Sequence, residues 1–153
     1  MTQRMRSVSV AVAVAGFVFA GLLSTQLAAH HSFAMYDQTI KKTMTGKLVR
    51  FILGASHSQF VFDVLDPDGK PVADKDGNTV KWQVELGSAA AIARQGVTVK
   101  TFTPGTVLSV TFYPQRDGRN QGAIAGPLIL CGMTLPAGGC TSATGQVMKP
   151  PAN

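Results

Sequence analysis

Three histidines are the residues whose types and positions point most directly to chemistry. His30 and His31 follow the small-residue run Leu27-Ala28-Ala29, and His57 lies in a short connection between two strand-like segments. If an export signal is cleaved after Ala29, His30 becomes the first residue and offers both an α-amine and an imidazole. These nitrogen ligands suit Cu(II), which binds most tightly among the divalent first-row metals. We therefore expect a metal site, with copper as the favoured cofactor, formed by His30, His31 and His57.

A second interpretation of the same histidines involves no metal. Two adjacent histidines after a signal can simply be a soluble start to a mature chain, and His57 can be an exposed loop residue. The pattern also lacks a histidine at the third position, which the well-known N-terminal copper motif has. If metal does bind, its affinity must fall in acid, because amine and imidazole bind metals only when deprotonated.

A second set of polar residues suggests ligand binding without a metal. Arg116 and Asp117 precede Gly118 in the loop between the last two expected strands. Arginine in such a loop can hold a carboxylate, a phosphate or a sugar. The competing interpretation is a turn with a local ion pair. The alternative function is therefore a metal-free binding module for a small anion, a glycan or a protein partner, through Glu85, Arg94, Arg116 and Asp117.

Signatures of catalysis are missing from the sequence. It contains no glycine-rich phosphate loop, no nucleophile elbow and no close pair of carboxylates. We therefore favour a non-enzymatic accessory protein, and a copper-dependent redox enzyme stays open as a third alternative. Nucleic acid is not an expected partner, because export and few outward-facing aromatic residues argue against it. The expected partner is a periplasmic protein or a small ligand.

The first 29 residues predict where the protein works. Arg4 and Arg6 precede a nearly uninterrupted apolar run and then the small residues before His30, the order typical of a secretory signal peptide. The run is short of the roughly 20 residues that a membrane-spanning helix needs, although an uncleaved anchor is the alternative. Cleavage removes two arginines and no acid, and so lowers the formal charge from +6 to +4. We expect a periplasmic or secreted protein that leaves the membrane after cleavage.

Two cysteines agree with export. Cys131 and Cys140 are separated by eight residues that include Pro136, Gly138 and Gly139, which allow a loop to close. A structural disulfide is the expected outcome in an oxidising compartment. A thiol pair used for redox chemistry or metal binding is the alternative, but the spacing matches no redox motif.

The elements that must position these residues follow from periodicity and turn residues. Alternating apolar residues predict strands, and Gly46 is expected to mark a bulge or bend in the first. Ser88 is expected to cap one short helix. The expected strands span 43–53, 59–65, 79–86, 107–113 and 124–135, with the helix at 89–95. This order predicts a mostly β, OB-like five-stranded barrel with its helix between strands 3 and 4, although a small open sheet is possible. The expected divisions are a signal peptide at 1–29, the β domain at 30–136 and a flexible tail at 137–153.

Several short motifs in a fixed order resemble a family of small exported bacterial proteins of unknown function. They are His30-His31-Ser32-Phe33-Ala34 with Tyr36-Asp37, Trp82-Gln83-Val84-Glu85-Leu86-Gly87-Ser88, Ala93-Arg94-Gln95-Gly96, Thr103-Pro104-Gly105 and Pro114-Gln115-Arg116-Asp117-Gly118. The usual Asn-Pro-His of the family is Ala55-Ser56-His57 here, so only the histidine matches. The resemblance implies export and a domain beginning near residue 30, and it assigns no activity.

Overall fold

The computed structural model describes residues 33–94, 97–98 and 100–148. The chain divides into two compact units, Met1–Met35 and Tyr36–Asn153. The described part of the first unit is a single 3-10 turn, η1 (Phe33–Met35). The expected signal peptide, His30 and His31 lie outside the described residues. The second unit holds the β domain.

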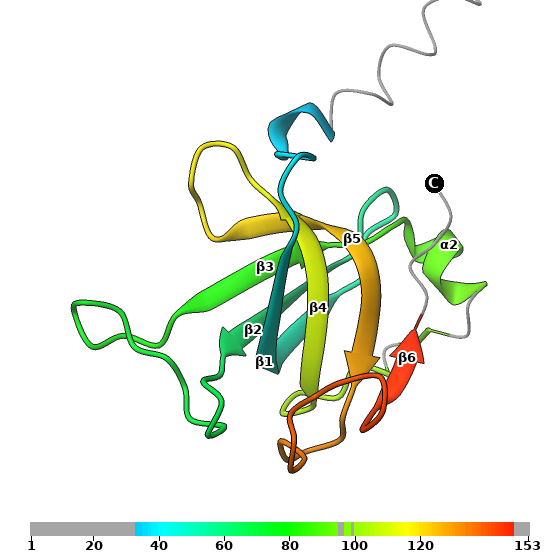
Figure 1. Cartoon of the computed structure of the whole chain (residues 1–153). Coiled ribbons are helices and arrows are strands. Elements are labelled where there is room, and N and C mark those ends of the chain that lie inside the picture. The colour runs from blue at the N-terminus through cyan, green and yellow to red at the C-terminus, as the bar shows by residue number, and fades with distance from the viewer. Residues whose placement is uncertain (1–32, 95–96, 99, 149–153) are drawn as a thin grey trace, which may run out of the picture. The chain divides into compact units, whose positions relative to one another are not determined.

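Five strands close into a barrel with an OB-like order (Figure 1). Antiparallel pairs run in the order β3-β2-β1-β4-β5, and a parallel pairing of β3 with β5 closes the ring. The one α-helix of the described residues lies between β3 and β4, as the sequence predicts. The bounds are β1 (Lys42–Ile52), β2 (Gln59–Val64), β3 (Lys81–Glu85), α2 (Ala89–Ala93), β4 (Val107–Pro114), β5 (Gln121–Leu130) and β6 (Gln146–Met148). The mostly β, OB-like fold is therefore confirmed, and closure excludes the open sheet.

Alternation along the strands fills the barrel interior. Phe60, Phe62, Val84 and Phe112 are fully buried, and Trp82 packs on Phe112 with ring centroids 4.9 Å apart. Residues between these positions point outward because side chains alternate along a strand. Trp82, the one tryptophan of the sequence, therefore belongs to the core. The same alternation leaves polar side chains on the outer face of β2 and β3.

The irregularities of the sheet differ from the sequence prediction. The bulge in β1 lies between Leu48 and Arg50, not at Gly46. Gly46 is instead a close-packing position, because an added Cβ would lie 2.1 Å from the ring of Phe62. The fifth strand begins and ends earlier than predicted, and Pro127 lies within it, where the pairing with β4 changes register. A proline is tolerated there because the local ladder is already interrupted.

The short helix is fixed at its start. Ser88 caps it, since its hydroxyl accepts a hydrogen bond from the Ala91 amide at 3.2 Å, as predicted. The Ala89 amide also donates to the carbonyl of Gly54 at 3.0 Å, which ties the helix to the β1–β2 loop. Ile92 anchors the helix in the core, and Arg94 forms its C-cap. The helix therefore stabilises the loop that carries His57.

A disulfide and a sixth strand extend the barrel beyond β5. Cys131 and Cys140 are bonded, with their Cα atoms 5.7 Å apart, so the predicted disulfide is confirmed. Cys140 is buried against Leu65 and Val107 in a second, smaller core. β6 pairs antiparallel with β5, so the segment expected as a flexible tail includes a strand attached to the sheet. In the part of the chain that the structure describes, no helix is long and apolar enough to cross a membrane.

Candidate functional site

Glu85 joins two segments that are far apart in the chain. It is the last residue of β3, and its oxygen Oε1 lies 2.7 Å from Nδ1 of His57. Its other oxygen, Oε2, accepts a hydrogen bond from the hydroxyl of Tyr36 at 2.9 Å. The β2–β3 register explains the first contact, because Gln59 pairs with Glu85 and His57 precedes Gln59 by two residues. One carboxylate thus holds a histidine and a tyrosine.

Tyr36 is fixed at the start of the β domain. Its side chain is buried, and its backbone forms a bridge with Gln115. Arg116 donates from Nε to the Tyr36 carbonyl at 3.1 Å, which brings the β4–β5 loop to the same place. Gln115 is buried as well, and its Oε1 accepts no hydrogen bond within the described residues. We call Tyr36, His57, Glu85 and Arg116 the carboxylate cluster.

Burial and charge set the protonation of the cluster. Burial raises the pKa of Tyr36 well above its ordinary value, and the neighbouring Glu85 charge and hydrogen bond raise it further. Tyr36 is therefore a neutral hydrogen-bond donor across the physiological range. Next to it, the hydroxyl and amide of Thr39 donate to Asp37 and lower the pKa of that carboxyl, with a smaller contribution from Arg116.

His57 has the arrangement of a histidine prepared for a ligand. Its Nδ1 faces Glu85, and its side chain is 43% exposed, against 15% for Glu85. Histidines that bind metals usually direct the second ring nitrogen at a carboxylate or carbonyl, which fixes the ring and raises its basicity. In this arrangement Nε2 is the nitrogen left for a proton or a metal. The residues described here contain no group of three or more histidine, cysteine or acidic side chains that could hold a metal, and they exclude His30 and His31.

Residues 20–124 match the model of a family of unknown function, DUF6152. The chain belongs to this family. The match confirms the resemblance seen in the sequence, and it contains all four residues of the carboxylate cluster. Cys131 and Cys140 lie outside the matched segment of this DUF6152 member. No curated protein and no solved structure matches the chain.

The structure brings together residues from two sets that were predicted separately from the sequence. His57, predicted as a metal ligand, contacts the carboxylate of Glu85, which was predicted as part of a ligand-binding set. Arg116 of that second set contacts Tyr36. Arg94 is an exposed residue at the end of α2 and has no contact with the cluster among the described residues. Tyr36 was not predicted as a site residue, although its place in the Tyr36-Asp37 motif was the available signal.

Asp117 is a turn residue rather than a member of the cluster. Its Oδ1 accepts from the amide of Arg119 at 3.1 Å, and its Oδ2 contacts the guanidinium of Arg119 at 2.6 Å. These hydrogen bonds, chiefly that from the Arg119 amide, lower the pKa of Asp117. The competing interpretation of Arg116-Asp117-Gly118 as a turn with a local ion pair therefore describes Asp117. A ligand-binding role for this residue stays a prediction.

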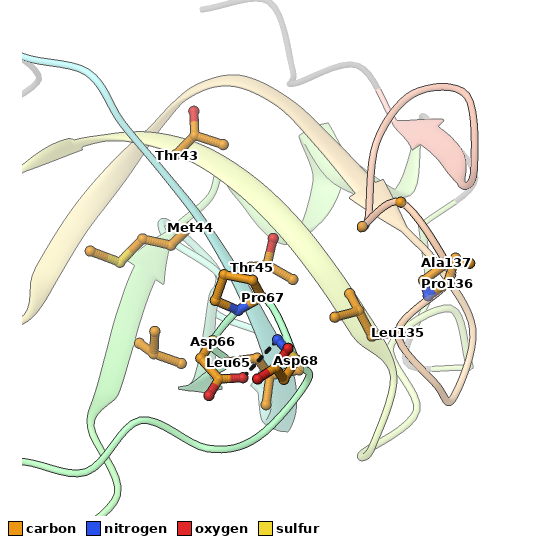
Figure 2. Close-up of a pocket in the computed structure, with 13 residues that line it drawn as sticks. Thr43, Met44, Thr45, Leu65, Asp66, Pro67, Asp68, Leu135, Pro136 and Ala137 are labelled. Carbon is orange, nitrogen blue, oxygen red and sulfur yellow. Dashed lines mark hydrogen bonds between the residues drawn. The ribbon is translucent and has the colours of Figure 1, made fainter.

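A hollow lies elsewhere in this DUF6152 member (Figure 2). It is an open groove of about 850 Å³ between β1, the end of β2 and the disulfide loop. Asp66 lines it, but one oxygen of Asp66 already accepts the amides of Asp68 and Lys70, at 2.9 and 2.8 Å. Of the site residues predicted from the sequence, none of those that the structure describes lines the groove. The groove and the carboxylate cluster are therefore separate features.

Proposed function

We propose that this protein is an exported accessory protein that binds copper, with His57, His30 and His31 as ligands. The observation that carries the proposal is the 2.7 Å contact between His57 Nδ1 and Glu85. It is the carboxylate–histidine arrangement that orients metal ligands and leaves the second ring nitrogen available. Imidazole ligands and a terminal amine favour Cu(II) over the other divalent metals.

Chain length supports the participation of the N-terminal histidines. Tyr36 follows His31 by five positions, so the backbone limits His31 to within about 18 Å of Tyr36. Tyr36 itself is bonded to the same carboxylate that holds His57. This short covalent connection would raise the effective concentration of both N-terminal imidazoles at His57.

Export to an oxidising compartment is part of the same proposal. A disulfide between Cys131 and Cys140 persists in the periplasm or outside the cell, and is rare in the cytosol. The segment before His30 has the order of a secretory signal. Cleavage after Ala29 would create the terminal amine that the copper site requires.

The test is a Cu(II) titration of the mature protein that begins at His30. Calorimetry measures the affinity, and the visible spectrum reports the copper ligands. A version with one extra N-terminal alanine should bind at least tenfold more weakly, because it lacks the histidine amine–imidazole chelate. His57→Ala should lose a ligand, and Glu85→Gln should weaken binding by about 10- to 100-fold, the usual effect of removing such an orienting group.

Asp68→Asn is the matched control, since it also converts an acid to an amide but lies on the turn after β2. It should bind copper like the unaltered protein. Equal affinity across all variants would show that the bound copper uses other ligands, and an absence of binding by the mature protein would reject the proposal.

A further inference from the structure

The outer face of β1, β2 and β3 carries a second group of polar side chains. The pairing places Arg50, Val61, Gln83 and Gln121 in one row across four strands, and Ile52, Gln59 and Glu85 in the next row. Side chains paired across a sheet share a face, and here it is the face opposite the buried phenylalanines. We call this surface the amide face: Arg50, Ile52, Gln59, Val61, Gln83 and Gln121.

Side-chain amides dominate the amide face. Gln83 donates from Nε2 to Oε1 of Gln59 at 2.7 Å, which holds the two groups in a fixed orientation. Each amide has two donor hydrogens and an oxygen with two lone pairs, so this bond uses only part of their capacity. Gln121 extends the row on β5. A ligand that covered this face would meet both donors and acceptors, and hydroxyl groups can bond to both.

The charge of this region is positive after pairing. Asp63 is paired with Lys81, and Glu85 is bonded to His57 and Tyr36. Neither Arg50 nor Lys47 forms an ion pair with any other described residue. Lysine thus neutralises Asp63 but not Glu85, and the two unpaired cations along β1 still outnumber this one acid. A ligand with carboxylates complements this surface, and arginine binds carboxylates with paired hydrogen bonds.

Two classes of macromolecule fit the amide face poorly. Single-stranded nucleic acid needs aromatic side chains for its bases to stack on, and the six residues include none. A peptide that adds a strand needs an open sheet edge, but β2 is paired with both β1 and β3. Of the two aliphatic residues of this face, Ile52 is 39% exposed and Val61 is buried. An acidic sugar chain needs neither stacking nor an edge.

We propose that the amide face binds an acidic oligosaccharide of the uronic acid class. Arg50 would hold a carboxylate, and the glutamines would bind hydroxyl groups beside the exposed Ile52. OB-fold proteins use the face of strands 2 and 3 for oligosaccharides and oligonucleotides, and the chemistry above selects between the two. This site uses none of the proposed copper ligands, so it does not depend on metal binding.

The experiment is calorimetry of the metal-free mature protein, in the presence of a chelator, with a tetramer of galacturonic acid. The fully methyl-esterified tetramer is the matched ligand, because it keeps the sugar backbone and loses the charge. We expect binding of the acid, and at least about tenfold weaker binding of the ester. Arg50→Ala and Gln83→Ala should each weaken binding of the acid about tenfold, whereas Lys70→Ala, which removes a distant exposed cation, should not.

Circular dichroism and thermal unfolding of each variant separate lost binding from lost folding, and Arg50→Lys provides a second, conservative variant. Its point charge should recover only part of the affinity. Equal affinity for acid and ester, or unchanged affinity in Arg50→Ala, would overturn the proposal. Tighter binding of poly-glutamate or of a single-stranded oligonucleotide would show that the occupant belongs to another class, and no binding at millimolar concentration would reject the site.

Discussion

Glu85 and Asp66 are both acidic residues next to strand ends, yet their hydrogen-bond partners lie at very different distances along the sequence. Glu85 accepts a hydrogen bond from the hydroxyl of Tyr36, 49 residues away, and also contacts His57. Among the described residues, the Asp66 side chain accepts hydrogen bonds only from the backbone amides of Asp68 and Lys70, which lie no more than four residues ahead. Glu85 therefore joins three segments of the fold, whereas Asp66 shapes one turn.

The turn pattern is repeated in the same hairpin, and this repetition explains the local acids. Asp74 accepts the amides of Asp76 and Asn78 at 2.9 Å, the same spacing as around Asp66. Aspartate before glycine satisfies turn amides by this geometry wherever it occurs. Such acids are fixed by local sequence and carry little information about function. A carboxylate with distant side-chain partners is a better indicator of a site, since turn formation does not explain it.

Glu85→Ala should give the largest effect. The substitution leaves the Tyr36 hydroxyl and His57 Nδ1 without their acceptor, and Tyr36 is buried. We expect the free energy of unfolding to fall by about 3 kcal/mol, the upper range for loss of a buried, charged hydrogen-bond partner. Urea denaturation followed by tryptophan fluorescence measures it. A loss under about 0.5 kcal/mol would mean that Glu85 is no more structural than a turn acid.

Tyr36→Phe should have an intermediate effect and should alter the pH dependence. Losing one hydrogen bond to a charged group should cost about 1.5 kcal/mol at neutral pH. The pKa of Tyr36 is raised from 10.0 by burial and then by Glu85, so folding favours the neutral phenol. The contribution of the Tyr36 phenol to the free energy of unfolding is therefore complete below pH 10. It is lost as the pH rises from there toward the folded-state pKa.

The measurement is urea denaturation of both proteins between pH 8 and pH 11.5. The stability advantage of the unaltered protein over Tyr36→Phe should shrink above pH 10. Tyr113 is present in both proteins and cancels in the difference. An advantage that stayed constant to pH 11.5 would show that Tyr36 ionises as easily in the folded chain as in the unfolded one.

Asp66→Ala should have a smaller effect that stays local. It removes an acceptor for two backbone amides that are exposed to water, so we expect a loss of about 1 kcal/mol. Copper affinity should not change, because Asp66 lies outside the carboxylate cluster. A change in copper affinity comparable with that of Glu85→Gln would break the distinction between the two acids.

The sequence predicts the fold well because its main signals are local. Alternation in Gln59–Val64 and Lys81–Glu85, a serine before the helix, and aspartate–glycine turns each act within a few residues. The positions that were mispredicted depend on partners from elsewhere. The bulge after Leu48 and the limits of β5 are set by pairing between strands, which periodicity does not reveal.

The carboxylate cluster shows the same limit. His57, Glu85 and Arg116 each stand out by type, but only barrel closure and the β2–β3 register bring them to Tyr36. The residue type of Tyr36 did not predict a site, because a single tyrosine before the first strand has no feature that distinguishes it from a structural tyrosine. Asp117 stood out more in the sequence, yet its contacts are local.

Asp117→Asn should give the smallest effect, and it tests whether a conspicuous acid matters when its partners are local. Its ion pair with Arg119 is exposed, and exposed pairs usually contribute little. We expect an unchanged urea midpoint near neutral pH, and unchanged affinity for copper and for the galacturonate tetramer. Lowering the pH through the depressed pKa of Asp117 should likewise reveal no difference beyond error, because the charge is screened by water. A clear loss of tetramer affinity would instead extend the amide face to the β4–β5 loop and would restore Asp117 to the ligand-binding residues.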